Sequence, residues 1–275
     1  MKFLDKIENI DRRLIYLAVI LAVILPLLFP VGMDVQVTKP VEDIYNYVEE
    51  LPDESIIWMG FDYTNSTRTE CDAQTIAFLH HVFRKNHKVF ITSTRPEGNN
   101  IAQNVLRKIT PLYNKEYGID YALLGYKPGN QVMMLQICQN VRGLYNTDVY
   151  GTPITDLVMM NQVKNAKDID FFFTSSSNAS FDGYVQVVST QYNIPMGGGS
   201  TAVSVPQYYI YIDSGQIVGI LGGLKGAAEY EKLIGIKGLA TSGMDAQSFV
   251  HLFVVILILI SNIIYFLKKY LKPQE

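Results

Sequence analysis

The sequence predicts a doubly wound, Rossmann-like α/β domain with a mainly parallel sheet, flanked by a transmembrane helix at each end. Two long apolar runs lie close to the ends of the 275-residue chain. Between them, compact apolar stretches alternate with stretches whose apolar residues recur at helical spacing, a pattern typical of a parallel sheet covered by helices on both faces. Polar residues gather directly after the strand-like stretches, where such a fold places its ligands.

The first apolar run, Leu14–Met33, is uncharged. About 20 helical residues span roughly 30 Å of hydrocarbon, so this run is long enough to cross a bilayer. A cleaved signal peptide is the alternative, because the run follows a charged start. However, Pro26 and Pro30 stand where a small-residue cleavage site is needed, and the run is long for a signal core. We therefore expect an uncleaved anchor.

Residues 34–247 are predicted to form one domain, because a boundary near 142–153 would leave halves too small to bury good cores. Apolar residues at 41, 44, 48 and 51 predict a helix over Val41–Leu51, and the apolar run Ser55–Phe61 predicts a buried strand. The same reasoning predicts helices over Asp72–Lys85, Asn100–Ile109, Gln131–Val141, Ile154–Asn165 and Gly183–Tyr192, and strands over Lys88–Thr92, Tyr121–Leu124, Asp170–Thr174 and from Ile194 to Met196.

Glycine dominates the rest of the domain. The run Gly197–Thr201 predicts a flexible or close-approach loop. Within Pro206–Ile234, small residues recur every four positions, which on a helix would form one smooth strip. These candidate interface residues are Gly215, Gly219, Gly223 and Ala227, with Gly222 and Gly226 repeating the spacing. The strip could pack a helix on the domain's own sheet or on another subunit. A β-hairpin of Tyr208–Ile212 and Gln216–Ile220 is the alternative.

The second apolar run, Phe249–Leu267, lies in a predicted transmembrane helix over 248–267, where Asn262 is a further interface candidate. Cations near span ends stay on the cytoplasmic side of a membrane. They cluster outside both runs, at Lys2, Lys6, Arg12, Arg13, Lys268, Lys269 and Lys272. We therefore expect residues 1–13 and 268–275 in the cytoplasm and the domain on the other side of a cell or inner membrane.

Composition excludes several classes of function. A net charge of −3 and a pI near 5.8 give no basic footprint for nucleic acid. Cys71 and Cys138 form no disulfide framework and are expected on opposite sheet faces, while the four histidines lack zinc-site spacing. His80 and His81 fall within a predicted helix, which favours a surface or capping role over base chemistry. No cofactor and no metal are predicted.

A ligand site, if present, is expected at the carboxyl ends of the strands. With strand order 3-2-1-4-5, the order reverses between the first and fourth strands, and ligands bind at that point. The candidate ligand-binding residues that follow the strands are Asp62, Thr64, Asn65, Ser93, Thr94, Arg95, Ser175, Ser176 and Ser177, with Thr174, Asn178 and Ser200 beside them. They suit a small polar or anionic ligand. The alternative is that they only cap helices and form turns.

Two of these stretches resemble haloacid-dehalogenase-type phosphatases. In that family an Asp ends the first strand and a Ser or Thr ends the second, as in Gly60–Thr64 and Phe90–Thr94. The resemblance implies a hydrolase of the phosphatase type. The chain departs from the family at Thr64, where a second Asp is required, and no acidic pair follows Phe171–Thr174 to hold magnesium.

The absence of an assembled catalytic site, the two anchors and the glycine strip together favour a non-enzymatic role. We expect a structural or accessory subunit of a membrane complex, in contact with lipid and with other membrane-protein subunits or a second copy. A membrane-tethered binding or sensor module for a small polar ligand is the first alternative, and an extracytoplasmic hydrolase is the second.

Overall fold

The computed structural model describes residues 11–177 and 179–271. It divides into two compact units. One is Val35–Ala240, an α/β domain. The other combines the chain before Val35 with the chain after Ala240 and contains two long helices. Asn178 and the terminal cations Lys2, Lys6 and Lys272 lie outside the described residues.

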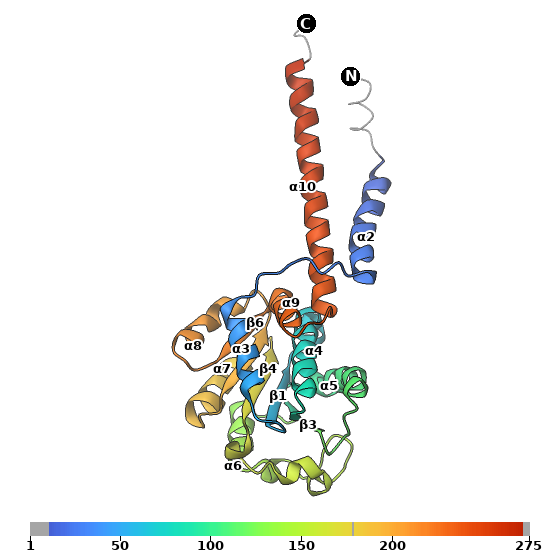
Figure 1. Ribbon diagram of the computed structural model, residues 1–275. Coiled ribbons are helices and arrows are strands. Elements are labelled where there is room, and N and C mark those ends of the chain that lie inside the picture. The colour runs from blue at the N-terminus through green and yellow to red at the C-terminus, as the bar shows by residue number, and fades with distance from the viewer. Residues whose placement is uncertain (1–10, 178, 272–275) are drawn as a thin grey trace. The chain divides into compact units, whose positions relative to one another are not determined.

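The domain is built on a six-stranded sheet in the order β3-β2-β1-β4-β5-β6 (Figure 1). All neighbouring strands pair in parallel. The strands are β1 (Ile56–Asp62), β2 (Lys88–Ser93), β3 (Tyr121–Tyr126), β4 (Phe171–Ser176), β5 (Met196–Ser200) and β6 (Gly219–Gly222). The predicted α/β class and the order 3-2-1-4-5 are confirmed, and β6 extends the sheet beyond the prediction.

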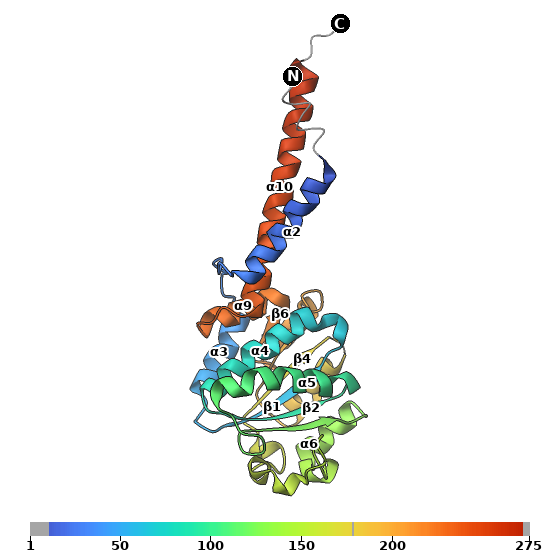
Figure 2. The ribbon, with the colours of Figure 1, turned by 90° about the vertical axis from the view of Figure 1, so that its right-hand side faces the viewer.

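Helices cover both faces of the sheet. Beside one core cluster lie α3 (Lys39–Glu50), α4 (Arg68–Arg84), α5 (Pro96–Ile109) and α9 (Gly223–Leu233). Beside the other lie α6 (Gln131–Leu144), α7 (Ser180–Tyr184), the π-helix η6 (Val185–Gln191) and α8 (Tyr209–Asp213). Figure 2 shows α4 and α5 side by side across the first face. This two-sided cover is the doubly wound arrangement.

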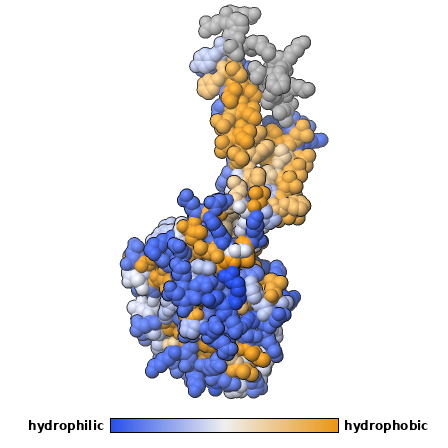
Figure 3. All heavy atoms as spheres, viewed as in Figure 1, coloured by the Kyte–Doolittle hydropathy of each residue, from blue (hydrophilic) through white to orange (hydrophobic). Residues whose placement is uncertain are grey.

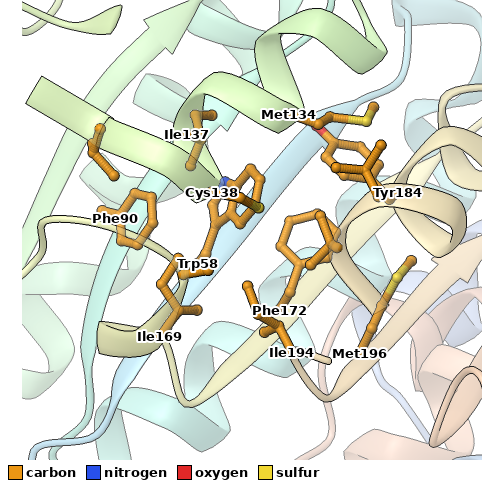
Figure 4. Close-up of a cluster of buried hydrophobic side chains, with 14 of the residues drawn as sticks. Trp58, Phe90, Met134, Ile137, Cys138, Ile169, Phe172, Tyr184, Ile194 and Met196 are labelled. Atoms are coloured by element: carbon orange, nitrogen blue, oxygen red, sulfur yellow. The ribbon is translucent and has the colours of Figure 1, made fainter. Parts of the chain in front are cut away.

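The core consists of one aromatic-rich cluster on each face, because successive strand residues point to opposite sides. Trp58 packs on Phe172, with ring centroids 4.4 Å apart, and its indole N–H donates to Thr92 Oγ1 at 2.7 Å. Figure 4 shows Trp58 between Phe90 and Phe172, with Tyr184 nearby. On the other face, Phe78 stacks on Phe173 with centroids 3.9 Å apart. Every residue of β1 and β4 is buried, as central parallel strands require.

Two predicted helices take a different form. The helix predicted over Ile154–Asn165 is replaced by short 3₁₀ helices, η3 (Ile154–Asp156) and η4 (Val158–Asn161). Four of the five buried apolar residues there recur every three positions, which matches the three residues per turn of a 3₁₀ helix; they are Ile154, Leu157, Met160 and Val163, and Met159 is the exception. The helix predicted over Gly183–Tyr192 begins earlier, in α7, and continues as η6.

The predicted loop at Gly197–Thr201 is wrong, because Gly197–Gly199 form most of β5. The expectation of close approach was correct. A Cβ atom at Gly198 would lie 2.5 Å from the Phe181 ring and 2.6 Å from the carbonyl oxygen of Thr174, and one at Gly199 would lie 2.2 Å from Gln74 Oε1. These glycines let helix side chains pack directly on the strand backbone.

The predicted helical strip over Pro206–Ile234 is also wrong. Gly215 lies in a turn with a φ of +71°, whereas Gly219 and Gly222 belong to β6. Gly223, Gly226 and Ala227 belong to the separate helix α9. The alternative hairpin is wrong as well. Its first predicted strand, Tyr208–Ile212, is largely occupied by the helix α8, and β6 pairs in parallel with β5. The four-residue spacing therefore crosses a turn, a strand and a helix and marks no common face.

The two long helices are α2 (Arg12–Leu28) and α10 (Leu239–Leu271), and Figure 3 shows their surfaces as mostly hydrophobic. Among the residues that the structure describes, α10 is the one helix long and apolar enough to cross a membrane. The first predicted span extends to Met33, but α2 has 17 residues and ends at Leu28. The chain leaves the helix just before Pro30, as expected for a residue preceding proline.

Candidate functional site

The carboxyl ends of β1 and β4 meet at a buried carboxylate. Asp62 Oδ1 accepts hydrogen bonds from the backbone N–H and the hydroxyl of Thr94, at 2.6 and 2.7 Å. Asp62 Oδ2 accepts from the Thr174 hydroxyl at 2.9 Å. The Tyr184 side chain also interacts with this carboxylate. We call these four residues the Asp62 cluster; it closes the point at which the strand order reverses.

Burial sets the proton affinity of this cluster. Asp62 has no exposed surface, and desolvation raises its pKa, although the hydrogen bonds from Thr94 and Thr174 act in the opposite direction. Desolvation also raises the pKa of Tyr184 well above its ordinary value, with the nearby Asp62 charge adding to the effect. Asp62 therefore ties three strand ends together from inside the fold, without facing solvent.

The other predicted ligand residues separate into buried and exposed sets. The Ser93 hydroxyl donates to the Phe61 carbonyl oxygen and accepts from Arg95 N–H. Ser176 Oγ lies 3.1 Å from Ser180 Oγ. Ser175 points to the opposite face, where it donates to Gln74 Oε1, because side chains alternate along β4. The residues that keep exposed surface are Thr64, Asn65, Arg95 and Ser177. The structure thus brings Asp62 and Thr94 into contact but does not gather all nine residues in one open crevice.

Gln74 is a key polar residue that was not among the predicted site residues. It lies on α4 and is fully buried. Its amide nitrogen lies 2.8 Å from the carbonyl oxygen of Ser200, 3.2 Å from that of Leu221 and 3.1 Å from that of Gly223. Gln74 therefore joins the ends of β5 and β6 to α4. A lone amide among the helix's buried apolar residues was the available signal.

A hollow lies beside the carboxyl end of β6, and we call it the β6 cavity. Its volume is about 230 Å³. Glu229 on its wall is 1% exposed, pairs with Lys225 and accepts from Thr38 N–H and Oγ1 at 2.8 and 2.6 Å. The remaining lining residues are Pro40, Val41, Ala202, Val205, Pro206, Tyr209, Ile220, Gly222 and Gly226. Gly222 and Gly226 were predicted to belong to a helical strip rather than to a cavity wall.

A second buried polar cluster centres on His81, which is fully buried, whereas a surface or capping role was predicted for it. Its Nε2 lies 2.9 Å from Glu49 Oε1, and its Nδ1 lies 2.7 Å from the Tyr230 hydroxyl. Desolvation lowers the pKa of His81 to about 4, although Glu49 acts in the opposite direction. The ring is therefore neutral in the folded protein near pH 7.

This shift predicts an acid-sensitive fold. The folded-state pKa of His81 lies below its ordinary 6.5, so its contribution is complete above pH 6.5 and is lost as the pH falls from 6.5 to 4. The loss amounts to about 3 kcal/mol. We expect His81→Gln to flatten the pH dependence of the unfolding free energy in this window, as measured by urea denaturation at a series of pH values. An unchanged dependence would assign the acid sensitivity to other groups.

In the helical unit, Asp245 joins α10 to the segment that follows α2. This carboxylate is 1% exposed and accepts hydrogen bonds from the N–H groups of Gly32 and Met33, at 2.8 and 2.9 Å. Pro26 of α2 and Ile264 of α10 are also buried. Asn262, the predicted interface residue on α10, is exposed.

Metal ligands and cysteines give no further candidate site among the described residues. Within 11–177 and 179–271, no three His, Cys, Asp or Glu side chains gather in a way that could hold a metal ion. The two cysteines are free and buried in opposite core clusters.

No protein-family model matches the chain, and no curated protein is similar to it. One solved structure, the substrate-binding protein of a sugar ABC transport system from Bordetella parapertussis 12822, shares 9% identity with a TM-score of 0.19. The match covers 69% of this chain and 85% of that chain. So weak a likeness carries no argument about function.

Proposed function

We propose that this protein is a structural or accessory subunit of a membrane complex, in which two helices anchor an extracytoplasmic domain that binds other proteins. The Asp62 cluster carries this proposal. An enzyme or small-molecule binder of this fold keeps polar groups open at the point where strand order reverses. Here the central carboxylate is enclosed, and its two oxygens accept hydrogen bonds from the hydroxyls of Thr94 and Thr174.

Two anchors are part of the proposal. The 17 residues of α2 span about 25 Å, which lies at the lower limit for a membrane crossing. The hydrogen bonds from Gly32 and Met33 to Asp245 join the C-terminal end of α2 to the N-terminal part of α10, so the two helices run antiparallel. Arg12 begins α2 and Lys269 lies in the last turn of α10, so each cation lies at the end of its own helix that is farther from this contact, which supports cytoplasmic placement of both termini.

An exposed apolar patch on the domain offers a surface for a partner. We call Val203, Pro206, Tyr209 and Ile210 the 203–210 patch. Val203 is 89% exposed and Ile210 is 66% exposed, and Pro206 and Tyr209 also line the β6 cavity. Clustered exposed apolar residues are typical of protein contact sites. The patch follows β5 and is held in place by buried Val205 and Tyr208.

Extraction from native membranes in mild detergent, followed by mass measurement and identification of co-purifying proteins, tests the proposal. We expect stoichiometric partners with the parent chain and their loss from the double variant Val203→Ser/Ile210→Ser. Leu112→Ser is the matched control, because Leu112 is 64% exposed but lies on η2 (Thr110–Tyr113). A parent chain that purifies without any partner would contradict the proposal.

A second candidate function is binding of a small ligand in the β6 cavity. The Lys225–Glu229 pair and the half-exposed Tyr209 suit a ligand with both polar and apolar parts. A true ligand at 100 times its dissociation constant would stabilise the fold by about 2.7 kcal/mol in a thermal-shift screen of amino acids, sugars and anions. Lys225→Met should abolish the shift, whereas exposed Lys164→Met should keep it. A shift unaffected by Lys225→Met would place the ligand elsewhere.

A further inference from the structure

The helix α10 has two distinct faces within the helical unit. One face is buried or half-buried, at Ala246, Val250, Phe253, Leu257 and Ile264. A residue two or five positions away from these lies roughly half a turn around the helix. The opposite face is a stripe of exposed residues spaced by four, three and four positions, namely His251, Val255, Ile258 and Asn262. We call these four residues the 251–262 stripe.

Asn262 is the unusual member of this stripe. It is exposed, and its carboxamide has no hydrogen-bond partner in the part of the chain that the structure describes. The apolar run Phe249–Leu267 is centred on Ile258, so Asn262 lies about 6 Å from the middle of the run along the helix axis. The hydrocarbon core extends about 15 Å on each side of its midplane. In lipid, an amide without a partner would cost several kcal/mol.

We propose that a second copy of this chain packs against the 251–262 stripe and that the two Asn262 carboxamides bond to each other. The inference rests on the proposal that α10 crosses a membrane. A carboxamide carries both donors and an acceptor, so two identical groups satisfy each other. Two copies inserted in the same orientation place Asn262 at the same depth, and a twofold axis brings the same face of each helix together. A second copy therefore supplies a complementary amide at the same depth and on the same helix face, without any further polar group.

Cysteine cross-linking of the full chain in native membranes tests this contact. We expect disulfide-linked dimers from single cysteines at Val255, Ile258 and Asn262. Cysteines at Ile256, Ile260 and Ile263 are the controls, because these exposed residues lie on another side of α10 and should cross-link far less. Cys71 and Cys138 are buried in the domain and should give little background. Equal cross-linking around the helix, or stronger cross-linking at the controls, would overturn the proposal.

Substitution of the amide gives an independent measure. We expect Asn262→Leu to weaken dimerisation in detergent or in a membrane reporter assay by about 3- to 30-fold, the range for hydrogen bonds between membrane helices. Ile263→Leu is the matched control and should dimerise like the parent chain. An Asn262→Leu variant that dimerises normally would refute the amide contact.

The same preparations separate this inference from the proposed function. Partner proteins that remain bound to Asn262→Leu while the parent chain gives no stripe cross-links would preserve the accessory role and refute the dimer. Stripe cross-links without any co-purifying protein would support the dimer and refute the role as subunit of a larger complex.

Discussion

Replacing Asp62 with Ala is expected to destabilise the domain by about 2–4 kcal/mol. The change removes the acceptor of the Thr94 N–H and of two hydroxyls, all inside the fold. A buried donor left without a partner costs about 1–3 kcal/mol. The Thr174 hydroxyl has a second acceptor, the Gly60 carbonyl oxygen 3.3 Å away, so Thr94 carries most of the cost. Denaturant unfolding followed by the fluorescence of Trp58 measures the change.

Asp62→Asn is the matched control for that variant. Its side-chain oxygen can still accept from Thr94, and its amide can donate to the Thr174 hydroxyl, so we expect a smaller loss. It also removes the titrating group. Because burial raises the pKa of Asp62, the contribution of this residue is complete below its ordinary pKa of 3.8 and is lost as the pH rises through the raised value.

Asp62→Asn should therefore gain stability relative to the parent chain as the pH rises above 4. If the unfolding free energies of the parent chain and of Asp62→Asn changed with pH in the same way, the carboxylate would not be held in a desolvated site. If Asp62→Ala were as stable as Asp62→Asn, the Asp62 cluster would not be what closes this end of the sheet.

Gly219→Ala should have a comparably large effect. A Cβ atom at Gly219 would lie 1.9 Å from the Pro40 carbonyl oxygen, which belongs to the backbone of α3. Because a backbone carbonyl cannot rotate away, α3 must shift off β6 or the strand must move. Overpacking of this kind costs about 1–3 kcal/mol, and a backbone clash places the change at or above the upper limit. Thermal unfolding of the full chain in detergent measures the loss.

Gly222→Ala is the control within the same strand. Its Cβ atom would approach the Val205 side chain at 3.3 Å, and its φ is −88°. A side chain can adjust, so we expect a change below about 1 kcal/mol. Equal losses at positions 219 and 222 would indicate that strand propensity, rather than the contact with α3, requires glycine at 219.

The arrangement of the sheet was readable from the sequence because its central strands are short, begin with uninterrupted apolar runs and are separated by helical patterns. β1 and β4 are buried on both sides and gave the clearest signals. The glycine-rich strands β5 and β6 gave weaker signals. The predicted fifth strand stopped at Met196, where β5 begins, and the β6 glycines were assigned to a helix, because these glycines serve close packing by helices and not the side-chain preferences that identify a strand.

The candidate site was only partly predictable for a related reason. The sequence places Asp62 and Thr94 at neighbouring strand ends, which is why their contact could be expected. It does not show whether such groups face solvent or each other. Gln74 reaches the strand ends from a helix, and the β6 cavity depends on packing between segments as distant as Thr38 and Glu229. Contacts of this kind are fixed by the tertiary structure alone.

Accessibility of single cysteines to a membrane-impermeant thiol reagent tests the two-anchor arrangement most directly. The exposed positions Arg12, Asp53 and Lys269 report on α2, the domain and the end of α10, and the native cysteines are buried. In intact cells we predict labelling at position 53 and, only after permeabilisation, at positions 12 and 269. Labelling of position 12 or 269 in intact cells, or protection of position 53, would contradict the account.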